Sequence, residues 1–152
     1  MKSVADALQS IAVTLWVGGL WAVGYLVAPT LFRVLPERAL AGMVAGRLFT
    51  LIAWVGIGCA AYLIVYRLAR HGVQALRQLA FWVTLVMLAL VAAGEFGVQP
   101  ILASLKDQAG AREVMESVLR DRFAAWHGVA SVLYLIVSAL GLVLAVAAGR
   151  GR

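Results

Sequence analysis

Ala89-Leu-Val-Ala-Ala-Gly-Glu-Phe-Gly-Val-Gln-Pro100 is an apolar stretch interrupted by a single carboxylate, Glu95. It lies within a longer apolar block, which predicts a helix that spans a membrane. An ionised carboxylate in hydrocarbon costs roughly 2.5–3.5 kcal/mol on insertion scales, so Glu95 needs a partner, water or a proton. This stretch therefore predicts both a membrane helix and a polar contact inside it.

The composition of the whole chain also indicates a membrane protein. The 152 residues are 64% hydrophobic and 13% charged, with a mean hydropathy of +0.96, whereas soluble domains carry about 25% charged residues. The apolar residues fall in blocks long enough to cross a hydrocarbon core of about 30 Å. We therefore predict an all-α fold, with residues 1–152 forming one integral membrane domain, a four-helix transmembrane bundle. The expected helices cover about residues 4–31, 41–68, 75–104 and 122–148.

A short amphipathic helix is expected over residues 111–121, before the fourth span. Apolar residues such as Val114 and Val118 recur there at helical spacing, while Arg112 and Glu116 lie on the opposite face. This helix would either lie on the membrane surface or extend the fourth span outward.

The charge distribution favours a lipid bilayer as the partner and argues against nucleic acid. The formal net charge is +6, but most basic residues flank the apolar blocks, where they anchor helices at the membrane interface. Basic residues are almost evenly divided between the two sides of the membrane. The side that holds both termini carries fewer acidic groups, and we expect it to be cytoplasmic.

The two halves of the chain show a faint internal repeat. Gly24-Tyr-Leu-Val-Ala-Pro29 can be aligned with Glu95-Phe-Gly-Val-Gln-Pro100, and each proline lies near the same end of its expected helix. The alignment suggests two helical hairpins in parallel arrangement, although two prolines at matching depth can also coincide by chance. Pro29 is expected to bend or end the first helix.

The polar residues of the spans are expected to gather in one half of the bilayer. Helices one and three run toward the side from which helices two and four start. Arg47 is the preferred partner of Glu95 because it stays charged, and His127 is the titratable alternative. Such a cluster either pins the helices in register or forms a site that binds a small ligand or handles protons. Its expected members are Arg47, Glu95, Gln99, Trp126 and His127.

Motifs of known enzyme chemistry are missing from the sequence. It contains no nucleophile–base pair, phosphate loop or dinucleotide fingerprint, so we predict no catalytic residues and favour a non-enzymatic protein. A lone histidine in the spans and scattered methionines give no recognisable metal site, and no cofactor is predicted. The tryptophans are expected to anchor or pack the helices, with a stacking platform for a quinone or porphyrin as the alternative.

Four stretches of the sequence resemble a bacterial family of four-helix membrane proteins of unknown function, itself similar to a eukaryotic transmembrane protein. The resemblance covers nearly the whole chain and implies a multi-pass protein of the bacterial inner (plasma) membrane, without an agreed activity. The stretches are Leu15-Trp-Val-Gly-Gly-Leu-Trp21, Ala28-Pro-Thr-Leu-Phe32, Ala41-Gly-Met-Val-Ala-Gly-Arg-Leu-Phe49 and Arg122-Phe-Ala-Ala-Trp-His-Gly-Val-Ala-Ser131. Positions that match the pattern are Gly18, Gly19, Pro29, Phe32, Gly42, Phe49, Pro100, Phe123, His127 and Gly128.

More distantly, the chain resembles the copper-resistance-D-like superfamily, which includes a HemJ-type protoporphyrinogen oxidase. That resemblance implies copper handling or haem-linked redox chemistry. The sequence has 2 histidines, and only His127 falls in an expected helix, which departs from a bis-histidine haem site within one chain. Three functions stay open: an intramembrane site for a small ligand or a proton, a haem- or copper-linked redox protein, and a structural subunit. A second copy or another membrane protein is a further expected partner.

Overall fold

The computed structural model describes residues 4–109 and 119–150, and helices make up almost all of this part of the chain. The first span comprises α1 (Val4–Trp21), the π-helical segment η1 (Ala22–Val27) and α2 (Ala28–Val34). The second is the continuous helix α3 (Arg38–His71), followed by the 3₁₀ turn η2 (Gly72–Arg77). The third comprises α4 (Leu79–Ala92), the π-helical segment η3 (Ala93–Val98) and α5 (Gln99–Ala109), and the fourth is α6 (Arg120–Arg150).

These spans confirm the predicted fold class. Four helical segments of the described chain are long and apolar enough to cross a membrane, and no strand occurs among residues 4–109 and 119–150. The all-α, four-helix bundle is therefore the architecture of a multi-pass membrane protein.

The second span, at 38–71, is longer than expected at both ends and the third ends at Ala109, and the element boundaries differ from the expected ones most clearly in three other places. The first span continues through Pro29 to Val34, because the π segment before the proline accommodates its missing N–H. The third span begins at Leu79, since residues 72–77 form a 3₁₀ turn that opens at Gly72 with φ +53°. The amphipathic helix expected over 111–121 falls mostly on residues 111–118, which lie outside the described residues, and α6 already begins at Arg120.

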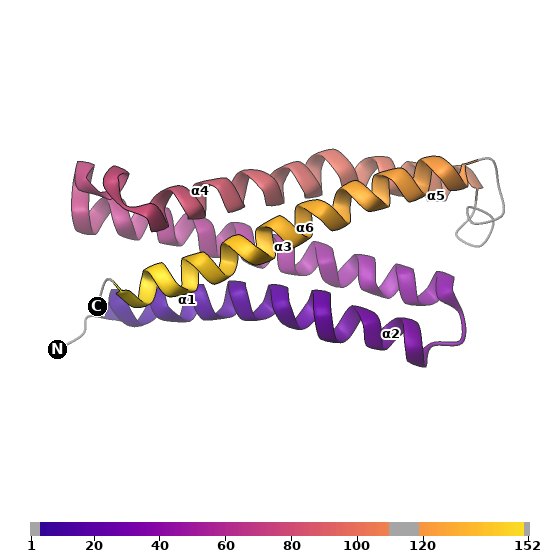
Figure 1. Ribbon diagram of the computed structural model, residues 1–152, viewed down its shortest axis with the longest axis horizontal. Helices are drawn as coiled ribbons and strands as arrows, with labels where there is room; N and C mark the ends of the chain where they lie inside the picture. Colours follow the sequence, from indigo (N-terminus) through magenta and orange to yellow (C-terminus); the bar gives the residue numbers. More distant parts are fainter. Residues whose placement is uncertain (1–3, 110–118, 151–152) are drawn as a thin grey trace.

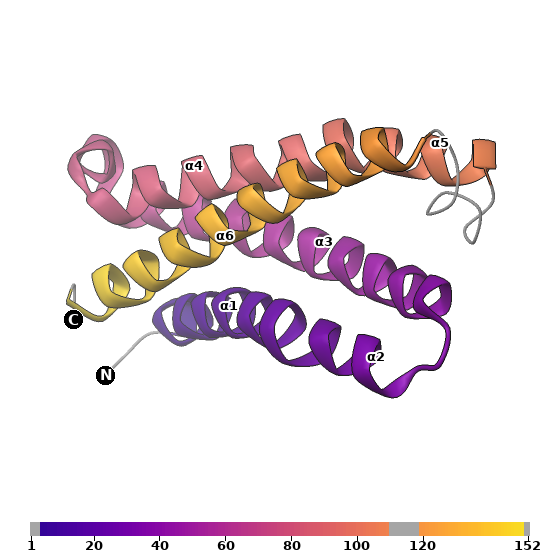
Figure 2. The ribbon, with the colours of Figure 1, turned by 45° about the vertical axis from the view of Figure 1, so that its right-hand side comes forward.

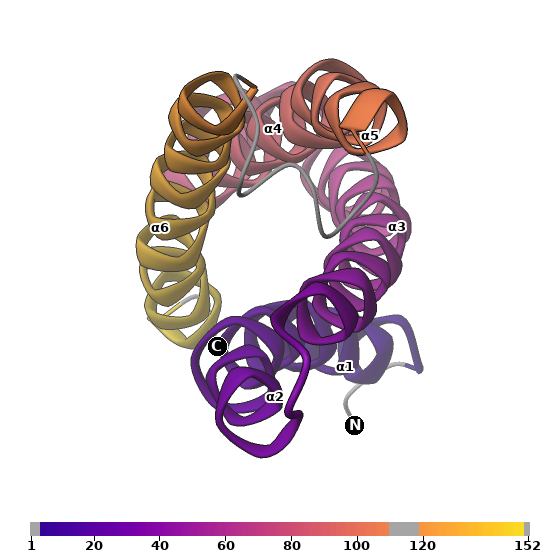
Figure 3. The ribbon, with the colours of Figure 1, turned by 90° about the vertical axis from the view of Figure 1, so that its right-hand side faces the viewer.

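The spans pack as a ring in which each packs mainly against two neighbours. Helix α1 packs against α3 and α6, and α4 packs against the same two helices from the opposite side (Figure 3). Helix α1 begins and α6 ends at the same end of the bundle (Figure 1). This antiparallel arrangement is what short connections between four spans produce.

The core is densest in the half of the bundle that holds these chain ends. Trp16 is fully buried there, and a Cβ atom at Gly56 would approach its Nε1 atom to 2.3 Å. Glycine at this position lets α1 and α3 approach closely enough to enclose the indole. Leu63, Met87 and Leu144 complete the core from the other three spans.

The two ends of the bundle are held differently. At the end with α1's start, the Tyr62 hydroxyl donates to the Ala5 carbonyl at 3.0 Å, and the Tyr66 hydroxyl donates to the Asp6 carboxylate. At the other end, α2 packs against α3 while α5 packs against α6. Figures 1 and 2 show α2 and α5 diverging toward that end, and we call these two helices the arms of the bundle.

Candidate functional site

Glu95 lies in η3, at the level where the two arms begin to diverge. Its side chain is partly buried, and the Thr50 hydroxyl of α3 donates a hydrogen bond to its Oε2 atom at 3.4 Å. Beside this contact, the rings of Trp54 and Phe96 meet edge to face with centroids 5.8 Å apart. The carboxylate is therefore held between α3 and the third span by a neutral hydroxyl and an aromatic pair.

The charged partners expected for Glu95 lie elsewhere. Arg47 is on α3, about one turn before Thr50, and its side chain is exposed. His127 is exposed on α6 and stacks on Phe123, with centroids 5.9 Å apart. Within residues 4–109 and 119–150, neither basic side chain forms an ion pair with Glu95.

The other two expected cluster residues lie near these groups without a described polar bond between them. Gln99 is partly buried at the first position of α5, directly after η3. Trp126 is partly buried near the start of α6, where the Lys106 ammonium lies 5.7 Å from the Phe123 ring centroid. The structure thus gives two groups, Glu95 with Thr50, and His127 with Phe123 and Lys106.

Tyr134 of α6 is a polar residue that the sequence interpretation missed. Its hydroxyl donates to the Leu20 carbonyl at 2.6 Å. This carbonyl lies just before the π segment η1, and the tyrosine ring lies against Gly24 within that segment.

The two π segments occupy equivalent places in the two halves of the chain. Segment η3 starts 71 residues after η1, at Ala93 against Ala22. Each is followed, two residues beyond its end, by a proline, Pro29 or Pro100. The alignment of the two sequence stretches therefore corresponds to a repeated structural feature, which supports the internal repeat.

The repeat also shows what distinguishes the second half. Glu95 stands where the first half has Gly24. A Cβ atom at Gly24 would lie 2.3 Å from Cε1 of Tyr134, so the tyrosine requires glycine there. At the second π segment a carboxylate projects from the equivalent backbone position and meets Thr50 instead.

The backbone around Glu95 departs from a regular α-helix. Pro100 has no N–H to donate, and π segments, which shift the ladder of helical bonds, are frequent at functional sites. The side chains supply a carboxylate and a hydroxyl, whose oxygen atoms suit a proton or a small cation. Among the described residues, no group of three or more His, Cys, Asp or Glu side chains gathers to hold a metal ion.

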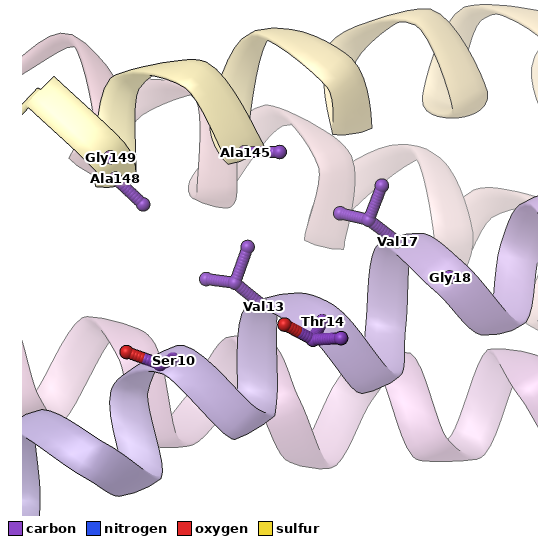
Figure 4. A pocket seen from close by; sticks show the side chains of 8 residues that line it. All are labelled: Ser10, Val13, Thr14, Val17, Gly18, Ala145, Ala148 and Gly149. Atoms are coloured by element: carbon purple, nitrogen blue, oxygen red, sulfur yellow. The ribbon is translucent and has the colours of Figure 1, made fainter.

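A groove of about 360 Å³ lies away from Glu95, between α1 and α6 near their outer ends (Figure 4). Small residues of α1, Ser10, Thr14 and Gly18, face Ala145 and Gly149 of α6 across it. Small residues at four-residue spacing are common where membrane helices associate. Its lining offers methyl groups, two hydroxyls and backbone, and no charged side chain.

Comparison with known proteins assigns the chain to a family. No curated protein and no solved structure matches it. A family described as "Domain of unknown function (DUF4149)" matches residues 11–111, which include both π segments, Glu95 and Pro100. This match supports the resemblance to a family of unknown function and adds nothing to the copper-resistance-D-like one. Because the matched region spans most of the chain, the protein belongs to the DUF4149 family.

Proposed function

We propose that this membrane protein binds and releases a proton at Glu95, inside the apolar part of the bundle. The observation that carries the proposal is the carboxylate's partner, a neutral hydroxyl at 3.4 Å. Ionisable groups within membrane spans face the bundle interior and serve proton or ion pathways. The Glu95 side chain is such a group, because it is partly buried within the third span and meets Thr50 of the second.

The ionised form of Glu95 is costly inside the apolar part of the bundle. A carboxylate in hydrocarbon costs roughly 2.5–3.5 kcal/mol on insertion scales, and an ion pair with Arg47 would offset that cost. Arg47 is exposed and makes no such pair in the described part of the chain. A bound proton removes the charge, and the resulting O–H can then donate to a carbonyl or to the Thr50 oxygen.

Infrared spectroscopy of the protein in phospholipid vesicles tests the proposal directly. We expect the C=O stretching band of a neutral carboxylic acid to appear and disappear as the pH changes, and Glu95→Gln to abolish it. The matched control is Asp121→Asn, which removes an exposed carboxylate at the start of α6 and should leave the band in place. A wild-type spectrum that Glu95→Gln does not change would refute proton binding at Glu95.

The same variant distinguishes this function from a structural role. Glutamine retains an oxygen that accepts the Thr50 hydrogen bond, so Glu95→Gln should keep the thermal unfolding midpoint of the wild type. A purely structural clasp through the same hydrogen bond also predicts an unchanged midpoint but no titrating carboxyl band, so the infrared band separates the two roles.

The haem- or copper-linked alternative would rest on His127, because His71 is the last residue of α3 whereas His127 lies inside α6. His127 is exposed and stacked on Phe123, and no group of three or more His, Cys, Asp or Glu side chains surrounds it among the described residues. Absorbance and metal analysis of the purified protein would reveal a Soret band or stoichiometric copper if this alternative held.

The proposal places the protein in the bacterial inner membrane with both termini in the cytoplasm. The family resemblance supports the membrane, and the scarcity of acidic groups near the termini supports the orientation. The divergent arms, with Glu95 at their base, would then face away from the cytoplasm.

A second copy of the chain is the partner we propose for the groove between α1 and α6, because small residues line both of its sides.

A further inference from the structure

The two π segments are equivalent in sequence position but differ in how they are held. In both, a backbone N–H bonds the carbonyl five residues earlier, Ala28 to Val23 in η1 and Gln99 to Gly94 in η3. Such segments carry weaker hydrogen-bond geometry than an α-helix, and they are places where a helix bends. Each one joins a helix of the packed half, α1 or α4, to a diverging arm, α2 or α5 (Figure 2).

Segment η1 is fixed by a side chain from another span. The Tyr134 hydroxyl donates to the Leu20 carbonyl at 2.6 Å, and its ring lies so close to Gly24 that a Cβ atom there would be 2.3 Å from Cε1. One turn of α6 further on, the Ser138 carbonyl accepts a hydrogen bond from Trp21 Nε1 at 3.3 Å. The tyrosine ring also packs against Phe49 of α3 at 5.0 Å between centroids.

Segment η3 contacts α3 through side chains and not through its backbone, since Phe96 packs edge to face on Trp54 with centroids 5.8 Å apart. In the described part of the chain no side-chain hydroxyl bonds its backbone, and the polar contact there is the 3.4 Å bond of Thr50 to the Glu95 side chain. Gly94 and Gly97 of this segment face open space, since a Cβ atom at either would meet nothing within 4 Å. Phe96 is largely exposed beside them.

We propose that η1 is a locked hinge and η3 a free one, with Tyr134 as the lock. The α5 arm then bends about η3 while the α2 arm stays fixed to α1. The hydrogen bonds at the opposite end of the bundle, from Tyr62 and Tyr66 to the start of α1, keep that end closed during the motion. The arms thus open and close on one side of the membrane only. This inference does not depend on proton binding at Glu95.

Distances between spin labels, measured by double electron–electron resonance, test the asymmetry. The repeat supplies two equivalent label pairs, because the 71-residue offset relates Leu15 to Val86 and Arg33 to Ser104, and all four side chains are exposed. Labels at Leu15 and Ser104 report the α5 arm against α1, and labels at Val86 and Arg33 report the α2 arm against α4. Cys59→Ala removes the native thiol.

We expect a broad or two-peaked distance distribution for the α5 pair and a narrow one for the α2 pair. Tyr134→Phe should broaden the α2 distribution to the width of the α5 one. Tyr25→Phe is the matched control, because it removes a hydroxyl from η1 without touching the bond of Tyr134 to the Leu20 carbonyl, and it should change neither pair.

Two results would overturn the inference. Distance distributions of equal width for the two label pairs in the wild type would mean that η1 and η3 do not differ in flexibility. An unchanged α2 distribution in Tyr134→Phe would mean that the tyrosine is not the lock. Retention of the α5 distribution in Tyr134→Phe verifies that the variant is folded, so a general loosening of the bundle is recognised separately.

Discussion

Gly24 shows how one missing side chain shapes the first span. A Cβ atom there would lie 2.3 Å from Tyr134 Cε1 and 3.0 Å from its hydroxyl, so Gly24→Ala must displace the tyrosine or the helix. Overpacking of this kind costs about 1–3 kcal/mol, and we expect a lowered thermal unfolding midpoint in detergent. Gly94→Ala is the control, because a methyl group there meets open space and alanine favours a helix. Equal destabilisation by both variants would contradict the role assigned to Tyr134.

At the same scale, the sequence identified Glu95 but not its contact. A single carboxylate in an apolar run is visible without a structure, and electrostatic reasoning then points to Arg47 and His127. The spans are apolar all round, however, so their sequences do not show which face turns inward. Thr50 lies three residues after Arg47 and faces the third span, whereas Arg47 is exposed.

The π segments could be located from sequence only in part. Pro29 and Pro100 mark where the spans are disturbed, and their flanking residues gave the alignment of the two halves. The prediction that Pro29 bends or ends the helix did not include a π segment. The Tyr134 hydroxyl that contacts the first π segment comes from a residue more than a hundred positions away in sequence, and such a contact leaves no local pattern.

The turn η2 is held to α3 by a buried charge. Arg67, near the end of α3, is buried, and its Nη1 atom donates to Gln78 Oε1 at 2.7 Å, while its Nε atom has no hydrogen-bond partner among the described residues. Gln78→Leu would leave the guanidinium without this acceptor. Hydrogen bonds to charged groups contribute about 1.5–3 kcal/mol, so we expect that loss in the free energy of unfolding.

The control for this element is Gln74→Leu, at an exposed position of the same turn. Chemical unfolding in mixed micelles compares the two variants with the wild type. If both leave stability unchanged, the Arg67 contact does not hold the turn.

At the scale of the molecule, composition and the length of the apolar blocks were enough to predict the four-helix bundle. Short connections then make sequential spans neighbours, which accounts for contacts of α3 with α1 and α4. The closure of the ring by α1 and α6 does not follow from connection lengths, because it joins the first and last spans. It depends on small residues, as at Gly141, where a Cβ atom would touch Val17 at 3.4 Å.

That closure gives the last prediction. In a Cys59→Ala background, Val17→Cys with Gly141→Cys places two thiols at a separation suited to a disulfide, and mild oxidation should cross-link them within one chain. Ile52→Cys with Gly141→Cys is the control, since α3 and α6 lie on opposite sides of the ring (Figure 3). Mass spectrometry of the oxidised monomer detects either bond. Preferential cross-linking of the control pair would place α6 beside α3 and refute the order of the helices on which the Tyr134 contact depends.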